Sequence, residues 1–211
     1  MFISRNLWAS AAMLAGLATA GIAQAATTAT FDELPTGTIL TTYQGLQWSN
    51  FGLFNGKNEP PQSGYLTGKV SKDNVAFNLF GAPANVSISS GTFSFLDAYL
   101  TGAWNDGLQL QLTGKNGATT LFSTTLTLNT VGPMHFVANW AGLTELDFVS
   151  FGGTENPALI PYGNGVQIAM DNFTFNTGPG VPEPSIWAMM LLGFAMGGVA
   201  IRRRAAKAVA A

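Results

Sequence analysis

The chain has 211 residues, of which only 9% are charged, compared with about 25% in a typical soluble protein. Residues 26–180 carry four lysines and no arginine against ten carboxylates, a formal net charge of −6. This charge argues against nucleic-acid binding, which depends on cationic contacts to phosphate. The absence of cysteine excludes thiol catalysis, cysteine-based zinc sites and disulfides.

The first 25 residues have the pattern of a secretory signal peptide. Arg5 precedes an apolar run over residues 7–17, and Ala23 and Ala25 form an A-x-A cleavage site. We therefore expect the Sec translocon to export the chain and signal peptidase to cut before Ala26. The alternative is an uncleaved membrane anchor, which the A-x-A triplet disfavours.

Residues 26–176 have the pattern of a single β-rich domain. Runs with β-branched and aromatic residues recur between Gly, Asn, Asp and Pro turn signals, and apolar and polar side chains alternate within several of them. This predicts an all-β fold, a single antiparallel β-sandwich or jelly roll. Strands are expected at residues 28–32, 46–54, 74–79, 85–89, 92–101, 107–113, 119–128, 133–139, 144–151 and 166–175.

Turn signals complete this outline of the domain. The pair Asn116-Gly117 predicts a hairpin between residues 107–113 and 119–128. The longest loop is expected at residues 151–165, and loops on a rigid sandwich often carry binding functions. The segments around Phe31-Asp32 and Asp171-Asn172 resemble the first and last strands of jelly-roll domains that are similar in architecture to carbohydrate-binding modules.

Acidic side chains stand near both ends of this domain. The first and last strands of a jelly roll are often neighbours, so Asp32, Glu33 and Asp171 are expected to converge. Calcium takes six to eight oxygen ligands, and these carboxylates, with Asn172, predict a structural calcium site. The alternative interpretation is that Asp32 begins a turn and Asp171 ends a strand.

Two aromatic residues in turn-like surroundings are candidates for glycan binding, since sugar rings stack on flat aromatic faces. Trp104 precedes Asn, Asp and Gly, and Tyr162 lies in the longest predicted loop. Trp48 and Trp140 are instead expected in the core, as tryptophan in a sandwich usually is.

The sequence offers little for catalysis. His135 is the only histidine, no G-x-S-x-G elbow is present, and one histidine without cysteine cannot form a zinc site. We predict a protein that is not an enzyme, with a glycoside hydrolase as a distant alternative. Its carboxylate pair would come from Asp97, Asp106, Glu145, Asp147 and Glu155.

Three elements follow the β domain in order. A Gly/Pro-rich linker at residues 177–185 is followed by an apolar run at residues 186–201, expected to form a transmembrane helix about 24 Å long. Residues 202–211 form a basic tail that should stay cytoplasmic. The sorting-motif residues in the linker are Val181, Pro182, Glu183 and Pro184, and the stop-transfer residues are Arg202, Arg203 and Arg204.

This arrangement of motif, apolar span and arginine cluster resembles the PEP-CTERM sorting signal of Gram-negative bacteria, also catalogued as the ice-binding protein C-terminal motif. The resemblance implies recognition by exosortase, cleavage near the motif and only a transient stay in the inner membrane. It also implies release to the cell surface or to an exopolysaccharide matrix such as that of a biofilm. We therefore predict a non-enzymatic surface or matrix protein. A carbohydrate-binding module for exopolysaccharide is the first alternative, and an ordinary tail anchor is the alternative for the C-terminal segment.

Overall fold

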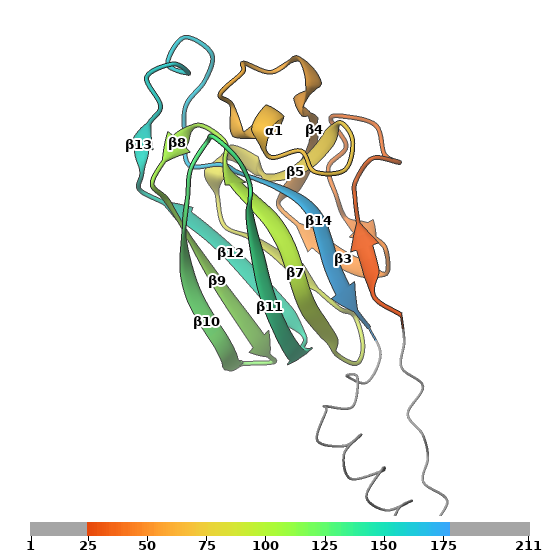
Figure 1. Cartoon of the computed structure of the whole chain (residues 1–211). Coiled ribbons are helices and arrows are strands. Elements are labelled where there is room, and N and C mark those ends of the chain that lie inside the picture. Colours follow the sequence, from red (N-terminus) through yellow and green to blue (C-terminus); the bar gives the residue numbers. More distant parts are fainter. Residues whose placement is uncertain (1–24, 178–211) are drawn as a thin grey trace, which may run out of the picture.

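The computed structural model describes residues 25–177. They form two antiparallel six-stranded sheets that pack face to face, joined by loops and a few short helical turns (Figure 1). The predicted all-β sandwich is therefore confirmed. The predicted signal peptide, transmembrane helix and basic tail lie outside the described residues. Within residues 25–177, no helix is long and apolar enough to cross a membrane.

The strands are distributed over three sheets. The first has the order β11 (Met134–Leu143), β7 (Phe93–Gly102), β14 (Ile168–Asn176), β5 (Asn74–Asn78) and β4 (Phe51–Asn55), with β1 (Thr27–Ala29) beside β14. The second has the order β10 (Thr119–Leu128), β9 (Leu108–Asn116), β12 (Glu145–Phe151), β6 (Ala84–Ser87), β3 (Leu46–Ser49) and β2 (Thr42–Tyr43). A third pairs β8 (Asn105–Asp106) with β13 (Thr154–Glu155), and the helical turns are η1 (Gly56–Asn58), α1 (Gly64–Thr67) and η2 (Leu79–Gly81).

Each of the ten predicted strand segments overlaps a strand of the structure. The segment at residues 46–54 is divided at Asn50, whose φ of 59° turns the chain so that β3 joins the second sheet and β4 the first. The predicted hairpin at Asn116-Gly117 is confirmed, with Gly117 at a φ of 56° between β9 and β10. The two-residue strands β2, β8 and β13 were not predicted.

The main core lies between the two sheets. Trp48 is 3% exposed and contacts the rings of Phe31, Phe51 and Phe173 at centroid distances of 5.6, 5.4 and 5.3 Å, as expected for a core tryptophan. Trp140 is half-buried and packs against the same core, so its predicted core position is confirmed in part.

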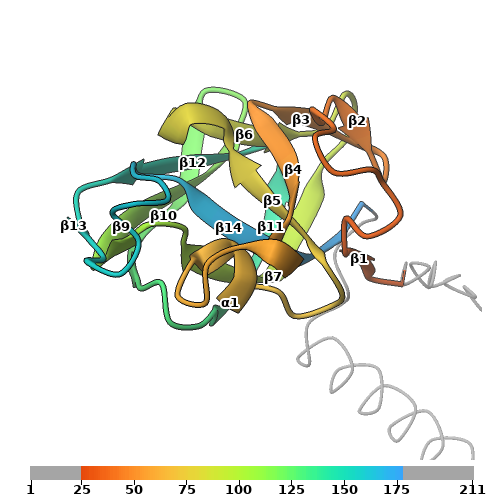
Figure 2. The same cartoon turned by 90° about the horizontal axis from the view of Figure 1, so that it is seen from above.

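A second, smaller apolar cluster lies on the outer face of the first sheet. Side chains alternate along a strand, so Val75 and Ala169 belong to this cluster while their neighbours Ala76 and Met170 belong to the main core. The cluster packs α1 and the loop around Leu159 onto the sheet, and Figure 2 shows α1 beside β7 and β14.

The first and last strands are neighbours, as the sequence predicted. β1 pairs antiparallel with β14, with Ala29 opposite Phe173 and Thr27 opposite Phe175. The chain therefore enters and leaves the sandwich at the same end, opposite the end that carries α1 (Figure 1).

Candidate functional site

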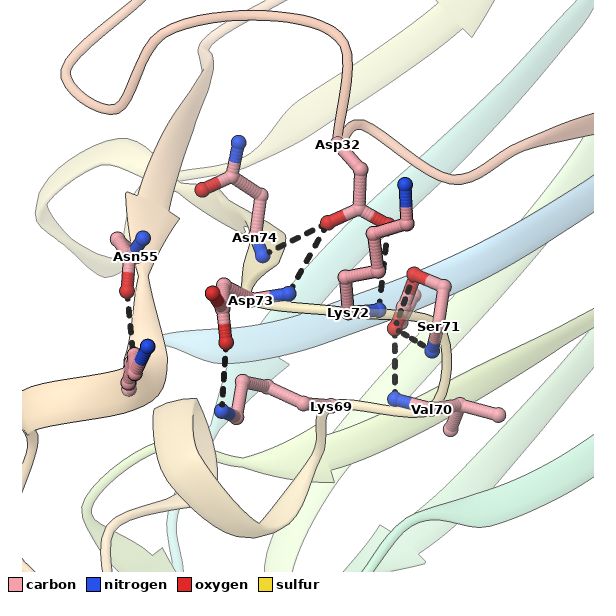
Figure 3. Close-up of polar contacts among 10 residues, drawn as sticks. Asp32, Asn55, Lys69, Val70, Ser71, Lys72, Asp73 and Asn74 are labelled. Carbon is pink, nitrogen blue, oxygen red and sulfur yellow. Dashed lines mark hydrogen bonds and ion pairs between the residues drawn. The ribbon is translucent and has the colours of Figure 1, made fainter.

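Two aspartates from opposite ends of the β domain, Asp32 and Asp171, hold one loop between α1 and β5, and Figure 3 shows Asp32 beside this loop. The Asp171 carboxylate accepts the backbone N–H groups of Val70 and Ser71 at 2.7 and 2.8 Å, and also the Ser71 hydroxyl. The Asp32 carboxylate accepts the next three N–H groups, those of residues 72–74, at 3.0 to 3.2 Å. Five consecutive backbone donors therefore end on two carboxylates, and we call this arrangement the aspartate clasp.

A residue with a positive φ stands next to each of the two aspartates in the chain. Phe31 has a φ of 64° directly before Asp32, and its ring is anchored in the main core. Asn172 has a φ of 50° directly after Asp171, where the pairing of β14 with β7 shifts register. Positive φ is uncommon for residues other than glycine, so these turns are special features of the chain. The Asn74 amide strengthens the first turn by donating to the Phe31 carbonyl at 3.1 Å.

The pKa values of the two carboxyl groups shift in opposite directions. Burial alone would raise the pKa of Asp32, but hydrogen bonds from Ser71 and from the N–H groups of residues 72–74 hold it below its ordinary value of 3.8. Asp171 is fully buried, and burial raises its pKa above the same value despite the hydrogen bonds that it accepts. The clasp thus combines one carboxylate stabilised as an anion with one whose charge is costly.

Glu33 is turned away from the clasp toward β2. Its carboxylate accepts the Tyr43 hydroxyl at 2.5 Å and the Gln44 amide at 3.0 Å. The hydrogen bond from Tyr43 contributes most to lowering the pKa of Glu33, while burial and this carboxylate raise the pKa of Tyr43 to about 12. Glu33 therefore fixes the ring of Tyr43, which is part of the main core.

Two grooves flank the clasp. One has a volume of about 440 Å³ and the other of about 310 Å³, and both are lined by Asp32 and Lys72. Within the described part of the chain, the Lys72 ammonium makes no ion pair. The remaining lining residues are Thr30, Glu33 and Ser71 in the first groove, and Leu34, Pro35, Thr36, Asn55, Asp73 and Asn74 in the second.

The structure brings Asp32 and Asp171 to one loop but does not gather them with Glu33 around one point. Among residues 25–177, no group of three or more His, Cys, Asp or Glu side chains is placed to hold a metal ion. The carboxylate oxygens of the clasp face N–H donors, which take the place of a cation. The Asn172 side-chain oxygen is buried and has no hydrogen-bond partner among residues 25–177. The calcium site stays a prediction.

The two predicted glycan-binding aromatics differ in exposure. Trp104 is only 9% exposed, its ring contacts Tyr65 at 5.4 Å, and Gly163 lies against its indole. Trp104 therefore packs in the second apolar cluster, and its role in glycan binding stays a prediction. Tyr162 is 64% exposed in the loop before β14 and stays a candidate.

The remaining acidic candidates and the histidine lie on the sheet surfaces and in the loops. His135 is in β11, as expected of a strand residue, where its ring stacks on Tyr99 at 4.3 Å and its Nε2 lies 3.2 Å from Asp97. Glu145 and Asp147 on β12 share Lys115 at 3.1 and 2.5 Å, and Asp106 accepts the hydroxyl and N–H of Thr130. Glu155 belongs to the short strand β13.

The loop residues of the site were missed by the sequence analysis. Ser71 and Lys72 stand in a polar run between the helical turn and β5, and such a run signals a loop without indicating what holds it. Their role in the site comes from backbone N–H groups, which every residue except proline possesses.

Two solved structures are similar to the chain. The K2 cleaved adhesin domain of Lys-gingipain shares 13% identity at a TM-score of 0.38, covering 73% of this chain and 99% of that domain. The CBM51 module from Clostridium perfringens GH95, solved in complex with methyl-galactose, shares 13% identity at a TM-score of 0.33 and covers 71% of this chain and 100% of that module. No curated protein is significantly similar to the chain.

A family comparison identifies the C-terminal segment. Residues 180–204 match the family described as the PEP-CTERM protein-sorting motif, which confirms the resemblance given by Pro182, Glu183 and Pro184. The motif implies export, processing by exosortase and a destination at the cell surface or outside the cell.

Proposed function

We propose that this chain is a non-enzymatic β-sandwich protein that a Gram-negative bacterium sorts through exosortase to its cell surface or exopolysaccharide matrix. The observation that carries the proposal is the sorting motif at residues 180–204, directly behind the last strand, which ends at Asn176. In this order, the segment that directs sorting follows a complete folded domain.

The fold is compatible with processing at both ends. β1 begins at Thr27, next to the predicted signal-peptidase cut before Ala26, and the main core extends from Ala29 to Phe175. Removal of both terminal segments therefore leaves the core intact. The proposed route uses the Sec translocon and signal peptidase, then a transient inner-membrane stage with residues 186–201 in the bilayer and residues 202–204 in the cytoplasm.

The placement of the acidic side chains supports a non-enzymatic role. Glycoside hydrolysis needs one carboxylic acid and one carboxylate on either side of a bound sugar. In this domain Glu145 and Asp147 both form ion pairs with Lys115. Asp106 accepts a hydrogen bond from the Thr130 hydroxyl, and Asp97 is paired with His135. We therefore assign these carboxylates to stabilising the strands and loops.

Mass spectrometry of the protein exported by its native host tests the sorting proposal. We expect the mature form to begin at Ala26 and to lack residues 202–204. Replacing Pro182→Ala within the motif should retain the C-terminal segment, whereas Pro179→Ala, which lies before the matched residues, should not. A wild-type protein that reaches the surface with residues 202–204 still attached would contradict the proposal.

Glycan binding at the grooves is the second candidate function. The observation that favours it is the combination of hydroxyls, carboxylates and the Lys72 ammonium around Asp32, groups that can hydrogen-bond to sugar hydroxyls. Retention of the exported protein on immobilised exopolysaccharide should fall in Lys72→Ala and not in Lys57→Ala, an exposed lysine outside both grooves. Tyr162→Ala tests the exposed ring separately. No retention of the wild-type protein on any acidic or neutral glycan would exclude this function.

A further inference from the structure

The edges of the sheets differ in how they are protected. An edge strand presents a row of backbone N–H and C=O groups that can pair with another chain, and proteins usually cover, shorten or distort such strands. The outer edge of β4 is covered by residues 37–40, through hydrogen bonds from Gly37 to Leu53 at 2.8 Å and from Leu40 to Phe51 at 2.9 Å. β1 and β2 are only three and two residues long.

The edge strand β11 is long but irregular. Its pairing with β7 shifts register twice, between Val137 and Trp140 and between Trp140 and Leu143. Asn139 has a φ of 52° within this stretch, and the Gly142 carbonyl accepts the Asn116 amide at 2.9 Å. Such distortions prevent a second strand from pairing along the whole edge.

The edge strand β10 is long, and most of its length is neither covered nor distorted. It is ten residues long and contains no charged residue and no proline. Its pairing with β9 is regular from Phe122 to Leu128, and the only register shift lies before Phe122. Within residues 25–177, the backbone of β10 has no hydrogen-bond partner beyond its ladder with β9. One long sheet edge is therefore open to pairing.

We propose that β10 pairs antiparallel with β10 of a second copy of this chain, about a two-fold axis at Thr124. This register places Phe122 opposite Leu126 on the half-buried face and Ser123 opposite Thr125 on the exposed face. Each pair is matched in chemical character, and side chains directly opposite one another stabilise an antiparallel ladder. The second sheet then continues from one copy into the other.

A second copy fits this edge because the strand is complementary to itself. A two-fold interface places the same surface on both partners, so like charges would meet in it, and β10 carries none. The nearest lysine on β9, Lys115, is already neutralised by Glu145 and Asp147. The five paired residues at positions 122–126 match the usual length of a strand, about five to six residues. This inference does not depend on the sorting or the ligand of the domain.

The absence of cysteine from the chain makes the register directly testable. In the proposed dimer the two Thr124 residues face each other, and directly opposite residues have Cα atoms roughly 4.5–5.5 Å apart. A disulfide spans roughly 4.4–6.8 Å between Cα atoms, so Thr124→Cys should crosslink. Thr127→Cys is the matched control, because six residues of strand would separate the two Thr127 positions by about 20 Å.

The experiment oxidises membranes that contain the full-length chain and separates the products on a non-reducing gel. We expect Thr124→Cys to give at least about tenfold more disulfide-linked dimer than Thr127→Cys. Dimers held together through the C-terminal segment alone would give both variants the same yield, and that result would overturn the proposal. Absence of the Thr124→Cys dimer, or its linkage to a different protein, would also overturn it.

Discussion

The two aspartates of the clasp hold the same loop from opposite sides, yet their surroundings differ. Asp171 is fully buried on the last long strand, and its charge is opposed by burial. Asp32 is half-buried at a turn after the first strand, and its charge is favoured by the loop donors. Both carboxylates accept hydrogen bonds from backbone N–H groups, but the cost of burial outweighs these bonds at Asp171 and does not at Asp32.

This difference shows which side of the clasp carries the stability. Water cannot easily replace a carboxylate that is as fully buried as that of Asp171, whereas it can replace the half-buried carboxylate of Asp32. The Asp171 side should therefore fix the loop to the sheet, and the Asp32 side should set the shape of the groove surface.

The largest effect is expected from Asp171→Ala. The change removes the acceptor of the Val70 and Ser71 N–H groups, and we expect the free energy of unfolding to fall by about 3 kcal/mol. Urea denaturation of the exported domain measures it. The control is Asp147→Ala, a partly exposed ion-pair partner of Lys115, for which a loss below about 1 kcal/mol is expected. Equal losses in both variants would contradict the anchoring role of Asp171.

A smaller effect is expected from Asp32→Ala. Three N–H groups lose their acceptor, but Asp32 is only half-buried, so water can take the place of its carboxylate, and we expect a loss of about 1.5 kcal/mol. Asp73→Ala is the control in the same loop, since within residues 25–177 the Asp73 side chain makes one partly buried ion pair, with Lys69. A loss larger than that of Asp171→Ala would reverse the proposed order of the two anchors.

The contributions of Asp32 and Asp171 to the free energy of unfolding should change in opposite directions as the pH falls. The folded-state pKa of Asp32 is below 3.8, so its contribution is complete above pH 3.8 and is lost as the pH falls through the folded value. The folded-state pKa of Asp171 is above 3.8, so the protein should gain stability relative to Asp171→Asn as the pH falls toward 3.8. The free energy of unfolding is measured for the wild type, Asp32→Asn and Asp171→Asn at pH values below and above 3.8. The difference between the wild type and each variant, plotted against pH, gives the slope for each aspartate. Slopes of the same sign in the two difference curves would disprove the contrast.

Most of the fold could be predicted from the sequence, because a sandwich imposes alternation on every strand that has one face in the core. Leu108, Leu110 and Leu112 are all fully buried, and the residues between them face outward. The strands β8 and β13 could not be predicted, because two residues are too few to show any alternation. The division at Asn50 was also missed, since an apolar run on both sides does not reveal that the chain changes sheets.

The candidate site could be predicted only in part. The proximity of Asp32 and Asp171 follows from the adjacency of the first and last strands, which is a property of the fold class. The object that they hold is a stretch of backbone at residues 70–74, and backbone donors leave no sequence signature. The burial of Trp104 could not be predicted for a related reason, because Tyr65 and Leu159, which pack in the same cluster, are distant from it in sequence.

The smallest effect is expected from calcium. In the clasp, backbone N–H groups already supply the positive ends of dipoles to the oxygens of Asp32 and Asp171, so a cation would have to displace them. We therefore expect the same melting temperature with calcium and with a chelator, both for the wild type and for Asp171→Ala, by differential scanning calorimetry. A calcium-dependent rise in the wild type that Asp171→Ala abolishes would instead establish the predicted metal site. In that case the buried side-chain oxygen of Asn172, which has no hydrogen-bond partner among residues 25–177, would be the next ligand to replace.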